Sequence, residues 1–163
     1  MTGAKILQLN TSPGGAPKHP VPTTHVGKLG LDGDGHRASN HGGRDRAVVL
    51  YGREQIERLQ SDGHPIVPGA VGENVTTVGL DYRKLCLGDR LRLGQSVVVE
   101  LTSHADPCAG IAAAFADGDF SHVFERKHPG MGRLTARVLT EGPLAPGDPI
   151  EVLPAPLRPA PGR

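Results

Sequence analysis

The sequence predicts a mainly β protein with a few short helices, in which the strands form a closed or partly closed β-barrel. About eight segments have the alternating or β-branched composition of strands. The 163 residues include 23 glycines and 15 prolines, which are spread along the chain and give turn signals at short intervals. A doubly wound parallel sheet would need more helices, so an antiparallel or mixed barrel is favoured.

In the first half, strands are expected over residues 5–10, 23–29, 48–50 and 75–77. A long loop is expected over 11–20, and loops of that length often bind a ligand or move. Residues 52–60 have a helical period, since Ile56 and Leu59 share one face and Gly63 is a plausible stop.

In the second half, the segments 85–94 and 96–102 are separated by a glycine turn and predict a hairpin. A further pair of strands is expected over 134–140 and 147–153. Residues 109–127 predict one or two short helices and contain all three phenylalanines. We expect a single domain over 1–153 and a flexible Pro-rich tail over 154–163.

Composition argues against several classes of protein. A net charge of +1 and 3% aromatic residues give neither the positive surface nor the stacking platforms that nucleic-acid binding needs. The first residues lack the apolar core of a signal peptide, and no window approaches the roughly 20 apolar residues of a membrane span. The chain is therefore expected to be cytoplasmic, with no membrane partner, and its two cysteines do not suggest a disulfide framework.

Two glycine-rich stretches, 41–51 and 68–77, stand beside short β-branched runs. Glycine allows backbone N–H groups to approach a ligand closely, and the neighbouring strands would hold such loops still. The glycine pattern alone favours the alternative that they are tight turns of a barrel, since glycines outside a known motif mostly mark turns. Lys18, Arg44 and Arg46 lie in predicted loops and could bind a phosphate, although solvated surface charge explains them as well.

Cys108 is the candidate reactive group. Asp106 could cap a helix, Pro107 suits its first position, and Cys108 would then lie in the first turn, where the helix dipole favours a thiolate. Against this, Asp106 repels a thiolate, and a free cysteine is often a small buried hydrophobe. Cys86, between two leucines, is expected to be core or inert surface.

Other catalytic templates fail. The eight histidines show no paired helical spacing and neither cysteine belongs to a CxxC pair, so a zinc site is not favoured. The sequence contains no Walker A loop, no GxGxxG after a strand and no GxSxG elbow.

An ordered set of short motifs nevertheless resembles the MOSC domain, which occurs at the C-terminus of molybdenum-cofactor sulfurases, in mitochondrial amidoxime-reducing proteins and as small bacterial proteins. The resemblance runs from about Ile6 to Leu153. Its motifs are Gly30-Leu31-Asp32-Gly33-Asp34, His41-Gly42-Gly43-Arg44-Asp45-Arg46-Ala47-Val48 with Tyr51 and Glu54, Gly69-Ala70-Val71-Gly72-Glu73-Asn74-Val75-Thr76-Thr77, Gly88-Asp89-Arg90-Leu91, Pro107-Cys108 and Gly147-Asp148.

This resemblance implies a β-barrel-rich fold that binds the pterin molybdenum cofactor, with Cys108 as the metal's protein ligand or as a persulfide carrier. It places Asn74 beside the cofactor. Further cofactor-binding candidates are His41, Gly42, Gly43 and Gly72 around the pocket, Lys18 or Arg44 for the phosphate and, with less weight, Arg133 and Arg137 near the final strands. The family usually has a basic residue shortly before Pro-Cys, where this chain has Ala105-Asp106, which leaves the substrate class open.

The expected activity is a two-electron reduction of N-hydroxylated small molecules. Electrons would come from a separate donor protein, since the chain has no flavin, haem or iron–sulfur motif. One alternative is a sulfur carrier, in which Cys108 holds a persulfide received from a sulfur donor for metal-sulfur cofactor assembly. A second is a non-catalytic barrel that binds a ligand or partner and in which Cys108 is simply buried.

Overall fold

The computed structural model describes residues 3–35 and 43–154, and the mainly β class is confirmed within them. The strands are β1 (Lys5–Thr11), β2 (His19–Val21), β3 (Thr24–Gly27), β4 (Gly30–Leu31), β5 (Val48–Gly52), β6 (Val75–Val78), β7 (Arg90–Leu93), β8 (Val97–Ala105), β9 (Arg133–Thr140), β10 (Gly142–Leu144) and β11 (Ile150–Val152). The helices are α1 (Arg53–Ser61) and the short 3-10 helices η1 (Arg44–Arg46), η2 (Tyr82–Lys84), η3 (Ala109–Ala114) and η4 (Phe120–Val123).

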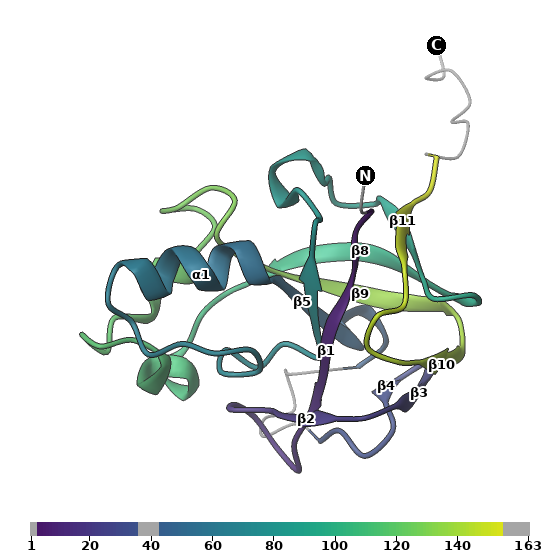
Figure 1. Cartoon of the computed structure of the whole chain (residues 1–163), viewed down its shortest axis with the longest axis horizontal. Coiled ribbons are helices and arrows are strands. Elements are labelled where there is room, and N and C mark those ends of the chain that lie inside the picture. Colours follow the sequence, from purple (N-terminus) through teal and green to yellow (C-terminus); the bar gives the residue numbers. More distant parts are fainter. Residues whose placement is uncertain (1–2, 36–42, 155–163) are drawn as a thin grey trace.

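The strands form two sheets. The larger has eight strands in the order β11-β7-β8-β9-β5-β6-β1-β2, and the smaller has the order β10-β3-β4. All paired strands are antiparallel except β5 and β6, which run parallel and are connected through α1. Figure 1 shows α1 to one side of the strands, with the small sheet at the lower end of the molecule. The fold is thus a mixed β structure with one crossover helix.

The closed barrel that the sequence suggested is not formed. Both sheets are open, and the edges of the larger are β2 and β11. β11 and the residues before it approach β1 through an isolated bridge, Lys5 to Pro149, and through backbone hydrogen bonds. Among these are the bonds from the Ile6 amide to the Asp148 carbonyl and from the Ile150 amide to the Ala4 carbonyl, both 2.9 Å long. Pro149 has no N–H to donate and β11 has only three residues, so these contacts do not extend into a continuous ladder.

Proline also explains two strands that the sequence did not reveal. β2 and β10 each have proline as their middle residue, Pro20 and Pro143. Both strands lie at the edge of a sheet, where a missing N–H is tolerated. A proline inside a short apolar run lowers its strand signal, so β2 was expected to be part of a loop. The predicted helix over 52–60 and the hairpin of β7 and β8 are confirmed, whereas residues 109–127 form only 3-10 turns.

The buried apolar side chains form two clusters, which we call the sheet core and the annex core. The sheet core lies on the strands and is exemplified by the alternately buried Val97, Val99 and Leu101 of β8. The annex core is formed by α1, η3, η4 and the loops between them, and its members are Tyr51, Ile56, Leu59, Ile66, Val71, Ile111, Ala114, Phe115, Val123 and Met131. Strand alternation builds the first cluster, and the second joins segments distant in sequence.

Candidate active site

Cys108 lies on the short connection between β8 and η3, and its side chain is exposed. Its sulfur is 3.5 Å from the point where a Cβ on Gly110 would stand, so a side chain at that position would be in van der Waals contact with the sulfur. The backbone at Cys108 is extended, with φ −142° and ψ 172°, and Cys108 itself is the N-cap of η3. The expectation that Asp106 caps this helix is therefore wrong. Pro107 disfavours helical geometry at Asp106, and the chain remains extended through Cys108.

Arg133, at the start of β9, is the buried positive charge of this region. Its guanidinium donates to the Val71 carbonyl at 2.8 Å and to the Asp106 carbonyl at 3.1 Å. It thereby holds the loop before Asn74 against the segment before Cys108. Burial lowers the pKa of Arg133 from its usual value, and the nearby Tyr51 and Cys108 oppose that shift.

One nitrogen of this guanidinium is left over. Nε of Arg133 is buried and has no hydrogen-bond partner among the residues that the structure describes. Buried polar atoms are normally paired, so a solitary donor beside an exposed thiol is a position where a ligand could bind. Because η3 is a short 3-10 helix with Cys108 at its cap, positive charge near the sulfur comes from Arg133 more than from a helix dipole.

Asp34 connects two of the predicted binding residues. Its carboxylate is 2.6 Å from Nζ of Lys18 and accepts a hydrogen bond of 2.9 Å from the Asn74 amide. Both side chains of the ion pair are almost fully buried. The Asn74 side-chain oxygen accepts from the Val49 amide at 2.9 Å, which fixes it at the junction of β5 and β6. The ammonium of Lys18 is thus already paired with an acid, whereas we expected it to be free to bind a phosphate.

Glu73 is a fully buried acid next to Asn74. One of its oxygens accepts from the Gly69 amide and from the Thr76 hydroxyl, both at 3.0 Å. The other has no partner among the described residues. Burial raises the pKa of Glu73, and the two hydrogen bonds only partly oppose that shift. Gly69 has φ +90°, and a Cβ there would stand 2.2 Å from the Lys18 carbonyl oxygen, so only glycine fits this turn.

The structure therefore brings the predicted residues together in part. Gly72 lies between Val71, which Arg133 binds, and Glu73, so one loop connects the Cys108 side with Asn74 and Lys18. Gly43 and Arg44 are exposed, at the start of η1, which packs against β9. Among the described residues, no hydrogen bond or ion pair joins Arg44 to this group. His41 and Gly42 lie outside the described residues.

Arg137, the other candidate on β9, lies elsewhere. Its guanidinium is 3.3 Å from the carboxylate of Asp45 on η1 and 3.8 Å from that of Glu100 on β8. Its charge is therefore shared with two acids on the outside of the sheet. Asp34 and Glu73, by contrast, occupy central places that the sequence did not assign. Their presence within the motifs was the one available signal.

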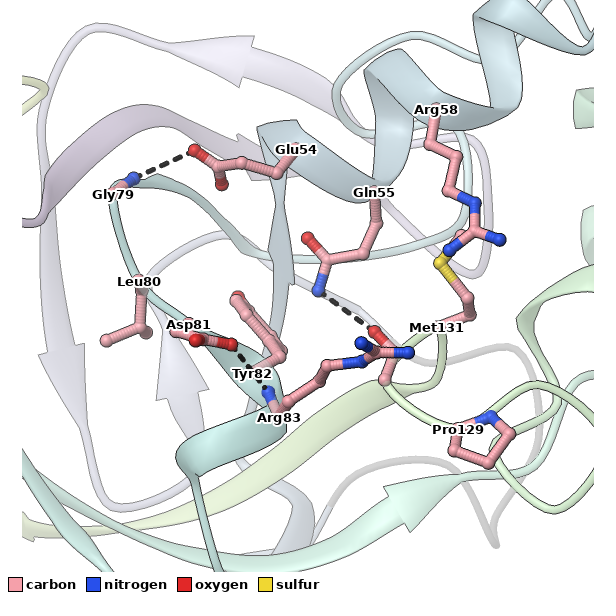
Figure 2. Close-up of a pocket in the computed structure, with 11 residues that line it drawn as sticks. Glu54, Gln55, Arg58, Gly79, Leu80, Asp81, Tyr82, Arg83, Pro129 and Met131 are labelled. Atoms are coloured by element: carbon pink, nitrogen blue, oxygen red, sulfur yellow. Dashed lines mark hydrogen bonds between the residues drawn. The ribbon is translucent and has the colours of Figure 1, made fainter.

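A separate cavity of about 380 Å³ lies beside α1. Figure 2 shows its walls, which come from α1, from the 79–83 segment and from the loop before β9. The lining residues are Glu54, Gln55, Arg58, Gly79, Leu80, Asp81, Tyr82, Arg83, Pro129, Gly130 and Met131. None of them is a predicted site residue, and Cys108 is not among them, so this cavity is not the site of the proposed chemistry.

Comparison with known proteins identifies the family. The family model of the MOSC domain matches residues 37–151. The chain belongs to the MOSC domain family. It is 35% identical over 125 residues to the Bacillus subtilis protein YflK, covering 76% of this chain and 55% of YflK. It is 30% identical over 132 residues to a Gibberella moniliformis protein named reductase, covering 78% of this chain and 23% of that protein.

Solved structures agree with this MOSC assignment. The crystal structure of YiiM from Geobacillus stearothermophilus matches with a TM-score of 0.67 and 26% identity, over 93% of this chain and 75% of that one. Among the curated relatives, the chain spans about half the length of YflK and under a quarter of the reductase. Within the described residues, no helix has the length and apolar character needed to cross a membrane.

Proposed function

We propose that this MOSC chain binds a molybdenum cofactor, with Cys108 as the protein ligand to the metal, and reduces N-hydroxylated small molecules. The observation that carries the proposal is the exposed sulfur of Cys108 near the buried guanidinium of Arg133. A soft thiolate is a suitable ligand for a thiophilic metal. The named reductase among the relatives supports the reaction class.

The residues present fit such a cofactor. The unpaired Nε of Arg133 offers a charge-assisted hydrogen bond to an anionic or carbonyl group. This arginine can supply the positive charge that the family usually carries just before Pro-Cys and that this chain replaces with Ala105-Asp106. Arg44 remains available for the cofactor's phosphate, whereas Lys18 would have to leave Asp34 or act together with it.

When bound, the cofactor supplies two electrons, which together with two protons convert an N–OH group to N–H and water. The chain's own residues have a positioning role. Arg133 fixes the Cys108 segment against the 71–74 loop, and the pairing of Asp34 with Lys18 and Asn74 holds the other side. Electrons would come from a separate donor protein, because the sequence provides no redox motif of its own.

Metal analysis of the chain purified from a cofactor-making host tests this proposal. Cys86 is also a free, exposed cysteine, so Cys86→Ser is the matched control for Cys108→Ser. Molybdenum should be present in the wild type and in C86S and absent from C108S. Reduction of an amidoxime by an artificial electron donor should follow the same order. A wild type that never carries molybdenum would refute the cofactor proposal.

The exposure of Cys108 also supports the sulfur-carrier function, since a persulfide needs an accessible thiol. It counts against the non-catalytic barrel with a buried Cys108. Intact-mass analysis separates the two chemical roles. A carrier should gain one sulfur atom at Cys108 that a thiol reductant removes, in a chain that binds no molybdenum.

A further inference from the structure

Three side chains from separate segments meet on the outer side of the annex core. They are His64 after α1, Asp117 after η3 and His122 within η4, and one potential ligand atom of each lies within 4.8 Å of the others. Nε2 of His122 is 2.9 Å from a carboxylate oxygen of Asp117. The ring centres of His64 and His122 are 4.5 Å apart.

The composition of this cluster suits a metal site, although both imidazoles also pack against Phe115 of the annex core. Two imidazoles this close repel each other if both are protonated, and one carboxylate neutralises only one of them. Their neutral nitrogens, together with a carboxylate oxygen, are the ligands that Zn²⁺ takes in proteins with three protein ligands and an open position. His64 is 8% exposed and His122 is half-buried, so the two imidazoles are largely fixed in place, while Asp117 is exposed and is held by its contact with His122.

Metal binding would break one existing hydrogen bond. Nδ1 of His64 accepts from the backbone amide of Ala116 at 3.1 Å, which places the ring proton on Nε2 in the neutral form. A ring that turns its lone pair to a metal gives up this bond. Ala116 is exposed, so water can satisfy its amide, and the exchange leaves no buried donor unpaired.

We propose that His64, Asp117 and His122 bind a zinc ion, at a site independent of Cys108. Bound zinc would replace the proton that His122 and Asp117 share and would tie the 117–122 segment to the loop after α1. That segment follows η3, which Cys108 caps, so the ion would restrain the chain on the far side of η3 from the sulfur. Because ligand nitrogens must be deprotonated, zinc affinity should be lower in acid.

Calorimetric titration of the full chain with Zn²⁺, after treatment with a chelator, tests the site. Asp117→Asn is the sharpest variant, because asparagine can still accept the hydrogen bond that Asp117 takes from the Asp119 amide. Asp119→Asn is its matched control, since Asp119 is exposed, close by and outside the cluster. Loss of a direct ligand should weaken binding by at least about tenfold, the lower limit for losing even an outer-shell partner.

A second pair of variants separates the histidines. His122→Gln should weaken zinc binding as D117N does. His128→Gln should not weaken it, although the ring of His128 is stacked with that of His122, with 6.2 Å between the ring centres. The double variant Cys86→Ser with Cys108→Ser should keep the zinc affinity, which distinguishes the cluster from the two exposed thiols.

Thermal unfolding distinguishes loss of the zinc site from a folding defect of the variant. Zinc should raise the Tm of the wild type and of D119N, with little effect on D117N, while the metal-free Tm of the two variants should be similar. Failure of the wild type to bind zinc would overturn the proposal, as would equal affinity in D117N and D119N. Zinc binding that disappears only with the cysteines would also overturn it, by assigning the metal to the thiols.

Discussion

The sheet core and the annex core are similar in apolar character but differ in how their polar atoms are satisfied. Most members of the sheet core lie on paired strands, whose backbone groups bond to one another. Among the described residues, four buried side-chain polar atoms have no hydrogen-bond partner. They belong to Gln55 on α1, to Glu73 in the loop before β6, and to His104 and Arg133 at the ends of β8 and β9 that connect to the annex elements.

This difference indicates that the sheet mainly stabilises the fold, whereas the annex provides polar groups for a ligand. Regular ladders satisfy backbone groups wherever the chain is extended, so the sheet can be stabilised by apolar burial alone. The annex is built from loops and 3-10 turns, and it retains donors and acceptors that protein atoms do not use. Unpaired buried groups cost free energy, which a bound ligand could recover. The site therefore belongs to the less regular half of the molecule.

Truncation of one core residue in each region should give the largest difference in the free energy of unfolding between the two cores. Leu101→Ala in the sheet core should lower the free energy of unfolding by about 2–5 kcal/mol, because the surrounding strands cannot collapse into the cavity. Ile111→Ala, on the short helix η3, should cost near the lower limit, about 2 kcal/mol, since a 3-10 turn can shift. Urea unfolding of both variants measures the difference, and equal losses would mean that the annex is as rigid as the sheet.

Arg133→Met should lower the free energy of unfolding by a smaller amount. It removes a buried charge but leaves the carbonyls of Val71 and Asp106 unpaired, at a cost of about 1–3 kcal/mol. In a C86S background, labelling of Cys108 by a thiol reagent should slow, because a thiolate there loses nearby positive charge. Arg133→Lys is the matched variant, since one ammonium cannot reproduce the guanidinium's two-sided contact. Unchanged stability and labelling would remove Arg133 from the site.

The Glu73→Gln variant tests the buried acid next to the annex through the pH dependence of the free energy of unfolding. Burial raises the pKa of Glu73 above its ordinary value of 4.5, so the folded chain keeps a proton that the unfolded chain has lost. The stability contributed by the protonated acid is complete below the unfolded pKa and falls as pH rises toward the folded one. The slope has a limit of about 1.4 kcal/mol per pH unit. Urea midpoints from pH 4 upward should fall less steeply in E73Q, and parallel slopes would show that Glu73 ionises freely.

How much the sequence could predict follows the same division. Alternation in segments such as Val97–Leu101 depends on neighbours two residues apart, so the main strands and the β7–β8 hairpin were predictable. The edge strands β2 and β10 were hidden by their prolines, and barrel closure depended on pairing between the chain's two ends. Such long-range pairing leaves no local pattern.

For the candidate site, motif order selected Cys108 and Asn74 as candidates but gave no sign of the residues that join them. Asp34 bonds to residues 16 and 40 positions away, and Arg133 reaches a carbonyl 62 positions away. Such separations have no periodicity that a sequence pattern could show. The same holds for His64 and His122, whose closeness depends on how the annex folds.

The smallest expected effect concerns an ion pair at the sheet's edge. Arg92 of β7 and Glu151 of β11 lie 3.3 Å apart, with side chains 43% and 61% exposed. Water and salt screen such a pair, so Arg92→Gln should lower the free energy of unfolding by only about 0.2–1 kcal/mol, less at high ionic strength. Arg90→Gln is the matched variant, because Arg90 pairs with the less exposed Glu100 across β7 and β8. If R92Q cost more than R90Q, the short edge strand β11 would depend on its side chains, and backbone pairing would not by itself account for the stability of this sheet.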